Sequence, residues 1–364
     1  MKKIISIVIG FILALSMVGC GSRMKDDVPE NAAYLVTFSS MFKQVGGYYY
    51  VSAEGDILSK STKLKVQDLY RFEVSEDRII LSGERHNNTL LFTRNSSIPN
   101  KDFIFLNNPK GTGVTTVASN GENVLGIMNG NFSDNVYKNL FVLQNLSGEV
   151  FTQYPLDIFA HKVLCFEEEA IIAGAYLEMQ SSSMLSVAEL LDCTDEDIKT
   201  YQYDEYKGFW DVVSYNGVLY CLAEGKDESR DTVVMIDATD YSIITESKLS
   251  DELVNLFVHN DSVYAVGNAG LYVVTSLDES VEQRVGFDQT LRANDTYAYF
   301  AYELDGKAYV FLRYQQRQKE NNDYIYGNMV QIDLDDAHIE VTQIKSNGKN
   351  KVDNIFIIPA SFVR

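Results

Sequence analysis

A hairpin that recurs about every 46 residues is the feature that most constrains this fold. Each copy is an apolar or alternating segment, a short polar turn and a second apolar segment; the turns are 75–77, 119–123, 167–169, 215–217, 259–261 and 304–306. Equivalent apolar positions after the turns are Ile79, Val124, Ile171, Val218, Val263 and Ala308, with spacings of 45, 47, 47, 45 and 45 residues. Unrelated turns would not keep this spacing, so the pattern indicates one structural unit repeated six times.

Each period also holds two further strand-like segments. After the fourth hairpin these are 232–237 and 241–248, and after the fifth they are 270–276 and 280–285. Four short strands in about 46 residues are typical of a β-propeller blade. The composition agrees, because 23 Tyr and 19 Phe with only 5 Pro favour pleated strands. Two stacked β-sandwiches are the alternative, although sandwiches rarely keep a constant four-strand period.

The two ends of the chain supply a further blade. Residues 352–358 resemble 253–258, the first strand of a blade, yet only six residues follow them. Segments 47–53 and 56–61 are two strands that lack a leading partner. Pairing them with the C-terminus would close the ring and remove open sheet edges. We therefore predict an all-β protein, a β-propeller of seven four-stranded blades whose last blade is closed by N- and C-terminal strands; six or eight blades remain open.

The period and patterning of residues 45–364 resemble the broad group of bacterial extracytoplasmic propellers related to quinoprotein-like and YVTN-repeat proteins. The resemblance implies a propeller outside the cytoplasm and no particular ligand. The WD-repeat signature is missing, because the one Trp-Asp pair, Trp210-Asp211, opens a first strand and does not end a third.

The N-terminus reads as an export signal. Two lysines precede an uncharged, largely apolar run at 4–18, which is short for a bilayer core of about 30 Å. The run ends at Met17-Val18-Gly19-Cys20, which resembles the lipobox of bacterial lipoproteins, with Met17 in place of the usual Leu. The resemblance implies cleavage before Cys20 and lipid attachment to its thiol. We expect a signal peptide at 1–19, a flexible tether at 20–32 and the propeller at 33–364.

The acidic net charge of the chain limits the classes of partner that it can bind. Removal of Lys2 and Lys3 would leave 29 basic against 51 acidic residues, a net charge of −22. This sign opposes binding to a nucleic-acid backbone and to anionic lipid. We expect attachment to the extracytoplasmic face of the cell membrane through the acyl chains on Cys20 alone, and no nucleic-acid partner.

Metal, cofactor and disulfide motifs are not recognisable. The histidines His86, His161, His259 and His338 lie far apart in sequence, and no Cys-x-x-Cys occurs. We interpret all four as solvated or structural and predict neither a metal site nor a cofactor. Calcium at acidic turns such as 192–197 or 333–336 remains an alternative. Beyond the signal, Cys165, Cys193 and Cys221 are interpreted as small buried residues, with one disulfide still possible.

Long polar connections point to one face of the propeller as the binding face. They are 129–137, 178–183, 224–231 and 315–323, between second and third strands, and would emerge beside the blade-to-blade loops. Aromatic residues on this side are the candidates for ligand contact; they are Phe132, Tyr137, Tyr206, Phe209 and Trp210.

The sequence favours a non-catalytic binding or scaffolding propeller with an unknown protein or glycan partner, because an anchor motif and a repeat fold occur without a catalytic motif. Two alternatives remain. One is an envelope enzyme, a hydrolase, lyase or quinone-type oxidoreductase that uses the central channel, which predicts clustered Asp, Glu, His, Tyr or Arg in that channel. The other is an accessory or sensor subunit of a membrane complex.

Overall fold

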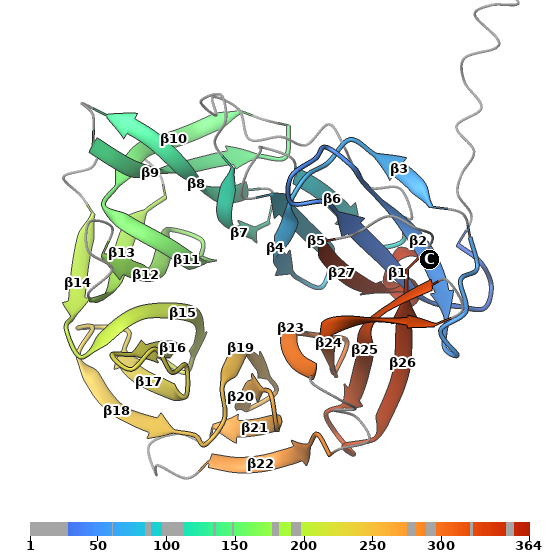
Figure 1. Ribbon diagram of the computed structural model, residues 1–364. Helices are drawn as coiled ribbons and strands as arrows, with labels where there is room; N and C mark the ends of the chain where they lie inside the picture. Colours follow the sequence, from blue (N-terminus) through green and yellow to red (C-terminus); the bar gives the residue numbers. More distant parts are fainter. Residues whose placement is uncertain are drawn as a thin grey trace, which may run out of the picture.

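The structure, a computed structural model, forms a ring of seven antiparallel sheets (Figure 1). It describes residues 28–364 except 60, 84–88, 97–112, 122, 134–135, 148, 177–181, 191–197, 275–280, 289–295, 321–322 and 347–352. The predicted seven-bladed β-propeller is confirmed. Within these described ranges, no helix combines the length and the apolar character that a bilayer crossing requires.

Six blades are continuous in sequence, and in each the strands pair in chain order from the axis outward. The first blade has three described strands and the next five have four. Blade by blade, the strands are β4 (Leu69–Val74), β5 (Arg78–Gly83) and β6 (Thr89–Thr93); β7 (Val114–Asn120), β8 (Asn123–Ser133), β9 (Val136–Asn145) and β10 (Val150–Leu156); β11 (Ile158–Cys165), β12 (Glu169–Tyr176), β13 (Ser183–Glu189) and β14 (Lys199–Tyr203); β15 (Tyr206–Tyr215), β16 (Val218–Gly225), β17 (Thr232–Asp237) and β18 (Ile243–Lys248); β19 (Leu253–His259), β20 (Ser262–Gly267), β21 (Gly270–Val274) and β22 (Val281–Gly286); β23 (Thr296–Leu304), β24 (Lys307–Glu320), β25 (Asp323–Asp333) and β26 (Ile339–Lys345).

All six predicted hairpins are present between the first and second strands of these blades. The turn between β15 and β16 shows why the sequence indicates them so clearly. Asn216 has φ 50° and Gly217 has φ 74°, the left-handed pair whose twist matches that of the flanking strands. Asn and Gly tolerate this conformation at low cost, so the turn chemistry and the apolar pattern agree.

The seventh blade is composite, as predicted. The C-terminal strand β27 (Asn354–Pro359) pairs with β1 (Ala32–Ser39), followed by β2 (Gly46–Ser52) and β3 (Thr62–Leu64). Two details of the prediction were wrong. The leading partner β1 was not anticipated, and 56–61 is not a strand, since Ile57 forms only an isolated bridge to Val51. The third strand pairs with the beginning of β2, so the residues before it serve as a connection.

Aromatic side chains close the ring between β4, β23 and β27. The closure cluster comprises Phe72, Phe300, Tyr302 and Phe356. The Phe356 ring centroid lies 4.7 Å from that of Phe72 and 4.8 Å from that of Phe300. The Tyr302 hydroxyl donates a 2.6 Å hydrogen bond to the Ile357 carbonyl. The last residue joins the two termini, because Arg364 donates to the carbonyls of Pro29, Glu30 and Ala32. Apolar contacts and satisfied hydrogen bonds together hold this blade.

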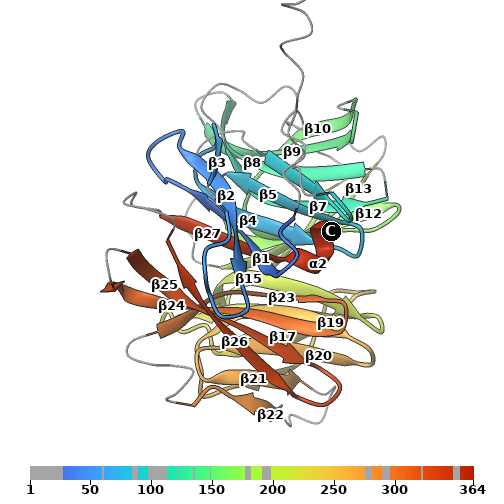
Figure 2. The same cartoon turned by 90° about the vertical axis from the view of Figure 1, so that its right-hand side faces the viewer.

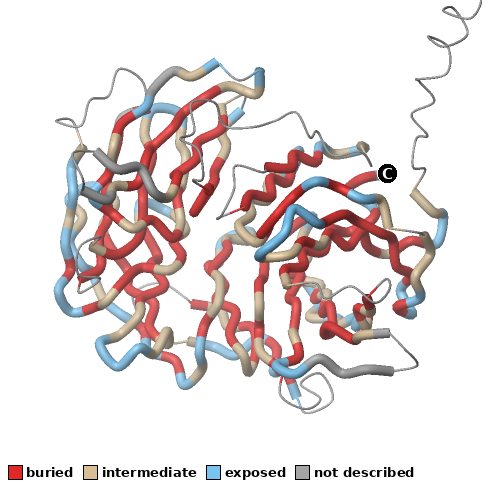
Figure 3. The backbone as a smooth tube through the Cα atoms, turned by 45° about the horizontal axis from the view of Figure 1, so that its top comes forward, coloured by how far each residue is buried: buried red, intermediate tan, exposed pale blue. Residues whose placement is uncertain are grey.

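The apolar core lies between neighbouring blades, whose sheets pack face to face around the ring (Figure 2). Buried residues follow the strands, whereas exposed residues gather at turns and on outer strands (Figure 3). Outer strands such as β18 and β22 alternate weakly and carry mostly exposed polar side chains. The inner strands differ from the outer ones because they lie next to the axis, where their side chains can line a cavity.

Candidate functional site

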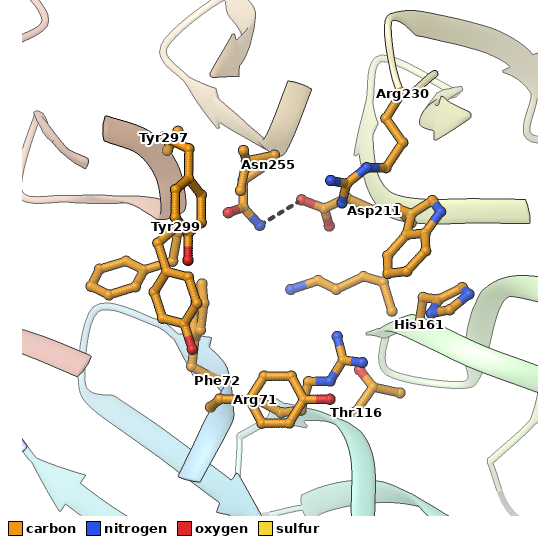
Figure 4. Close-up of a pocket in the computed structure, with 15 residues that line it drawn as sticks. Arg71, Phe72, Thr116, His161, Asp211, Arg230, Asn255, Tyr297 and Tyr299 are labelled. Atoms are coloured by element: carbon orange, nitrogen blue, oxygen red, sulfur yellow. Dashed lines mark hydrogen bonds between the residues drawn. The ribbon is translucent and has the colours of Figure 1, made fainter. Parts of the chain in front are cut away.

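A cavity of about 290 Å³ lies at the axis, lined mainly by side chains from within the first six residues of six inner strands. Figure 4 shows these side chains converging from different blades, with Tyr297 and Tyr299 across the cavity from His161. We call this cavity the axial pocket. One lining residue, Arg230, comes from the β16–β17 connection. The pocket therefore lies at the end of the ring where second-to-third-strand connections emerge.

A repeated β-bulge shapes the axial pocket. In each of the six continuous blades the pairing of the inner strand with the second strand skips a residue near the axial pocket; these residues are Tyr70, Thr115, His161, Trp210, Val254 and Tyr299. The β15–β16 pairing also skips Lys207. A bulge interrupts the two-residue alternation and re-aims neighbouring side chains. As a result, two consecutive residues of one strand both line the cavity, for example His161 with Lys162 and Trp210 with Asp211.

Three cations among the described residues line this cavity, and two of them, Lys162 and Arg71, differ in how their charge is balanced. Lys162 forms an ion pair with Glu73 of β4, with 3.6 Å between Nζ and Oε2. Burial opposes the charge on Lys162, yet the carboxylates of Glu73 and Asp211 raise its pKa overall. Arg71 forms no ion pair within the described part of the chain: its Nε is buried without a hydrogen bond, and its guanidinium lies 4.5 Å from the Tyr70 ring centroid. Tyr299 and the buried Asp68 favour its charged form without pairing with it. Burial lowers the pKa of Arg71 to about 10, so the side chain remains a cation at neutral pH.

Asp211 organises the opposite side of the axial pocket. It is 3% exposed, and its Oδ2 accepts hydrogen bonds from Asn255 Nδ2 at 3.1 Å and from the Leu256 amide at 2.8 Å. Burial raises the pKa of this carboxyl, while Lys162 and the hydrogen bonds oppose the rise. Asn255 in turn accepts from the Ala301 amide at 2.9 Å. This chain of hydrogen bonds joins three successive blades and fixes the polar wall of the cavity.

An aromatic stack forms the third part of the wall. The His161 and Trp210 rings are stacked with centroids 4.1 Å apart, and the Arg230 guanidinium lies 5.0 Å from the indole. The indole N–H donates to Glu224, and Arg230 pairs with Glu252 at 2.6 Å. His161 is 9% exposed and its Nδ1 has no hydrogen-bond partner. Burial and the charges of Arg71 and Arg230 lower the pKa of His161 to about 3, so its ring is neutral.

The structure describes the side chains of three of the five aromatic residues that the sequence suggested. Trp210 lines the axial pocket. Phe209 is fully buried between blades, and Tyr206 is buried beside it with its hydroxyl donating to Glu246. Phe132 and Tyr137 face each other in the β8–β9 ladder, and their side chains lie outside the described residues. Of the two other aromatic side chains that the structure describes, Tyr206 and Phe209, neither lines the axial pocket with Trp210.

Two of the predicted irregular connections are paired backbone. Parts of 129–137 continue the β8–β9 hairpin, and parts of 315–323 continue the β24–β25 hairpin. Their polar residues do not alternate with apolar ones, so the sequence lacks the usual strand signal even though backbone hydrogen bonds form. Most of 178–183 lies outside the described residues.

Sequence reasoning missed most of the axial pocket, including His161, which it interpreted as solvated or structural. A usable signal exists: the skipped residues precede the repeat positions Ile79, Val124, Ile171, Val218, Val263 and Ala308 by 9, 9, 10, 8, 9 and 9 residues. Adjacent polar or aromatic pairs at that offset, such as His161-Lys162, therefore mark the axis.

The structure also bears on the cysteines and on the residue types that bind metal ions. Cys165 and Cys221 are free thiols, whereas Cys20, Cys193 and His86 lie outside the described residues. Among the residues that the structure describes, His, Cys, Asp and Glu side chains form no group of three or more suited to a metal ion.

Comparison with known proteins identifies the fold and no family. No family model matches the chain, and the search of curated proteins found no relative. A functionally unknown protein from Desulfotomaculum acetoxidans DSM 771 matches with a TM-score of 0.53 and 7% identity, covering 86% of this chain and 98% of that chain. The β-propeller domain of Cps50 (Swd1) from Myceliophteria thermophila gives 0.52 and 10%, covering 75% and 85%. Apo AztD from Citrobacter koseri gives 0.49 and 12%, covering 90% and 98%. At these identities the likeness concerns the propeller fold alone.

Proposed function

We propose that this protein is a lipid-anchored, extracytoplasmic binding propeller that takes a small ligand in the axial pocket and performs no chemistry on it. The observation that carries the proposal is the pocket itself. A cavity of about 290 Å³ collects a buried Arg71 nitrogen and a buried His161 nitrogen that lack hydrogen-bond partners. Buried polar atoms are normally satisfied, and those left unsatisfied in a cavity suit a ligand that completes them.

The anchor rests on the sequence. The segment Met17-Val18-Gly19-Cys20 resembles a lipobox, and the acidic chain would gain nothing from charge attraction to anionic lipid. We expect Cys20→Ser to leave an unprocessed precursor or release the protein from membranes, as measured by fractionation and by mass spectrometry of the N-terminus. Normal cleavage with unchanged membrane retention would contradict the lipid anchor.

The chain carries its own binding reporter. Trp210 is its single tryptophan and lines the axial pocket, so indole fluorescence reports directly on ligand entry. We expect small-molecule fractions from the envelope to change this fluorescence. The variant Val254→Phe, which places a larger side chain at the pocket wall, should remove the response. Val341→Phe, the same exchange at an exposed position on β26, is the matched control.

Clustered titratable groups favour a second candidate, an envelope enzyme that uses the channel. His161, Lys162 and Asp211 line the same cavity, with Glu73 paired behind Lys162. Against catalysis, both Asp211 oxygens already accept backbone hydrogen bonds, which leaves this carboxylate poorly placed as a base. Chromatography of the bound ligand after long incubation separates the two candidates, because a binding protein returns the ligand unchanged.

A further inference from the structure

We infer that the ligand of the axial pocket is a small monocarboxylate, held by the guanidinium of Arg71. This inference rests on the proposed function and names the chemical class that the site would recognise. It follows from three properties of the cavity: one cation that forms no ion pair within the described residues, two carboxylates that limit the charge of the ligand, and a small volume.

Arg71 stands apart from the other arginines. Each of the others whose side chain the structure describes donates to a carboxylate or a carbonyl: Arg78 to Asp77, Arg94 to Asp305, Arg230 to Glu252, Arg284 to Asp335, Arg313 to Asp353 and Arg364 to Pro29. Arg71 has a ring contact with Tyr70 and a buried Nε without a partner. A guanidinium with a free N–H edge pairs with a carboxylate through two parallel hydrogen bonds, and such pairs are short and strong.

The surrounding charges favour a single negative charge on the ligand. Lys162 is paired with Glu73, and Arg230 is paired with Glu252, whereas Arg71 interacts with Asp68 without forming an ion pair. Arg71 is therefore the lining cation whose N–H groups are open to a ligand carboxylate. Asp211 is also at the wall, 3% exposed. A second negative charge would be repelled by Asp211 and Glu73 at short range in a poorly solvated site. A phosphate monoester or a dicarboxylate is therefore a worse fit than a monocarboxylate.

The remainder of the ligand is small and polar on at least one side. About 290 Å³ corresponds to roughly ten water molecules at about 30 Å³ each, which is the size of one sugar ring or one aromatic acid. Asn255, Thr116 and the neutral His161 ring offer hydrogen-bonding groups around this space (Figure 4). The unpartnered His161 Nδ1 is the second polar atom that such a ligand would satisfy.

The test uses the full-length chain in detergent and the fluorescence of Trp210. Lactate, glucuronate and benzoate are titrated beside their uncharged counterparts lactamide, glucose and benzamide, with inorganic phosphate and sulfate as other anions. We expect at least one monocarboxylate to change the fluorescence and to raise the unfolding temperature, while its uncharged counterpart does neither. Arg71→Gln should weaken that binding about tenfold or more, Arg71→Lys should recover part of it, and Arg284→Gln should leave it unchanged.

Each other outcome overturns the inference. Uncharged compounds or phosphate that bind better than the carboxylates, with Val254→Phe blocking them, would show that the ligand class is wrong while the axial pocket remains the binding site. Titration up to roughly 10 mM detects binding free energies as small as about 3 kcal/mol. If no compound changes the fluorescence in that range, the proposed monocarboxylate ligand is wrong. If envelope fractions also leave Trp210 unaffected, the proposed binding function fails with it. Circular dichroism of the Arg71 variants confirms that any loss of binding occurs in a folded chain.

Discussion

Phe72 and Phe300 contact each other at the closure of the ring and also line the axial pocket. The composite blade and the axial pocket differ in whether buried polar groups have hydrogen-bond partners. In the composite blade, Thr37 donates to the Phe356 carbonyl at 3.0 Å, and Tyr302 donates to Ile357. In the axial pocket, one nitrogen each of Arg71 and His161 is left without a partner. Hydrogen bonds thus tie the strands together where the ring closes, whereas the axial pocket holds two buried nitrogen atoms that a ligand could satisfy. Local departures of this kind are expected at functional sites.

The largest expected effect is the loss of ring closure. Removal of residues 354–364 takes away four apolar side chains that are at most 1% exposed, at 355–358. At roughly 1.5–3 kcal/mol each, their burial contributes roughly 6–12 kcal/mol, comparable to the whole stability of a typical domain. We expect no cooperative unfolding transition by calorimetry, together with aggregation through the exposed edge of β1.

A graded control accompanies the truncation. Phe356→Ala removes one ring of the closure cluster and should cost about 3–5 kcal/mol while leaving a cooperative transition. A truncated chain that melts cooperatively near the temperature of the intact chain would show that β27 does not hold the ring.

These two regions also differ in how far the sequence predicts them. Ring closure follows from apolar patterns and a fixed repeat, so the C-terminal strand could be assigned to an N-terminal blade. The strand β1 was missed because its burial shows no two-residue alternation: four consecutive residues, 33–36, are apolar and three of them are buried. Such a run does not distinguish a strand from other buried segments.

The axial pocket was missed for a different reason. Bulges put adjacent residues such as Trp210 and Asp211 on one wall, whereas alternation places neighbours on opposite faces. Proximity to the predicted loops does not distinguish Trp210, which lines the axial pocket, from Phe209 and Tyr206, which are buried between blades. Pairwise contacts such as that of Lys162 with Glu73 join strands about 90 residues apart and have no local signal.

The next largest effect is expected from Lys162. Lys162→Met leaves the Glu73 carboxylate, which is 19% exposed, without its cation. Breaking a largely buried pair on one side destabilises strongly, and we expect a loss of about 3 kcal/mol in the free energy of unfolding, measured with urea. The double variant Glu73→Gln with Lys162→Met should recover most of the loss. Equal destabilisation in the single and double variants would mean that the pair does not act as a unit.

Replacement of Arg71 is expected to raise the free energy of unfolding, whereas replacement of Lys162 lowers it. Arg71→Met removes a cation whose pKa burial lowers to about 10 and which forms no ion pair within the described residues, although Asp68 partly offsets the effect of burial. We expect the free energy of unfolding at pH 7 to rise by about 1–2 kcal/mol while binding in the axial pocket is lost. Arg313→Met provides the contrast, because Arg313 donates to the Asp353 carbonyl at 2.8 Å and its removal should destabilise. A destabilised Arg71→Met would show that the guanidinium is a structural element.

The smallest effect is a pH dependence from His161. Its pKa is about 3 in the folded chain and 6.5 ordinarily, so below pH 6.5 the unfolded chain takes up a proton that the folded chain does not. Stability contributed by the neutral ring is therefore complete above pH 6.5 and declines as the pH falls, by about 1 kcal/mol between pH 6.5 and 5.5. Glu73 and Asp211 have raised pKa values and oppose this trend, so the comparison must be between variants.

His161→Phe keeps an aromatic ring against Trp210 and removes the titrating group. Across the same interval we expect this variant to lose about 1 kcal/mol less than the parent chain, in urea unfolding at each pH. The control is His338→Gln, because the His338 side chain is 67% exposed. Its loss of unfolding free energy over this pH interval should equal that of the parent chain. If His161→Phe also follows the parent, the imidazole in the folded chain takes up its proton over the same pH interval as in the unfolded chain. The axial pocket would then hold one more cation beside Arg71, and a ligand with two negative charges would fit it better than a monocarboxylate.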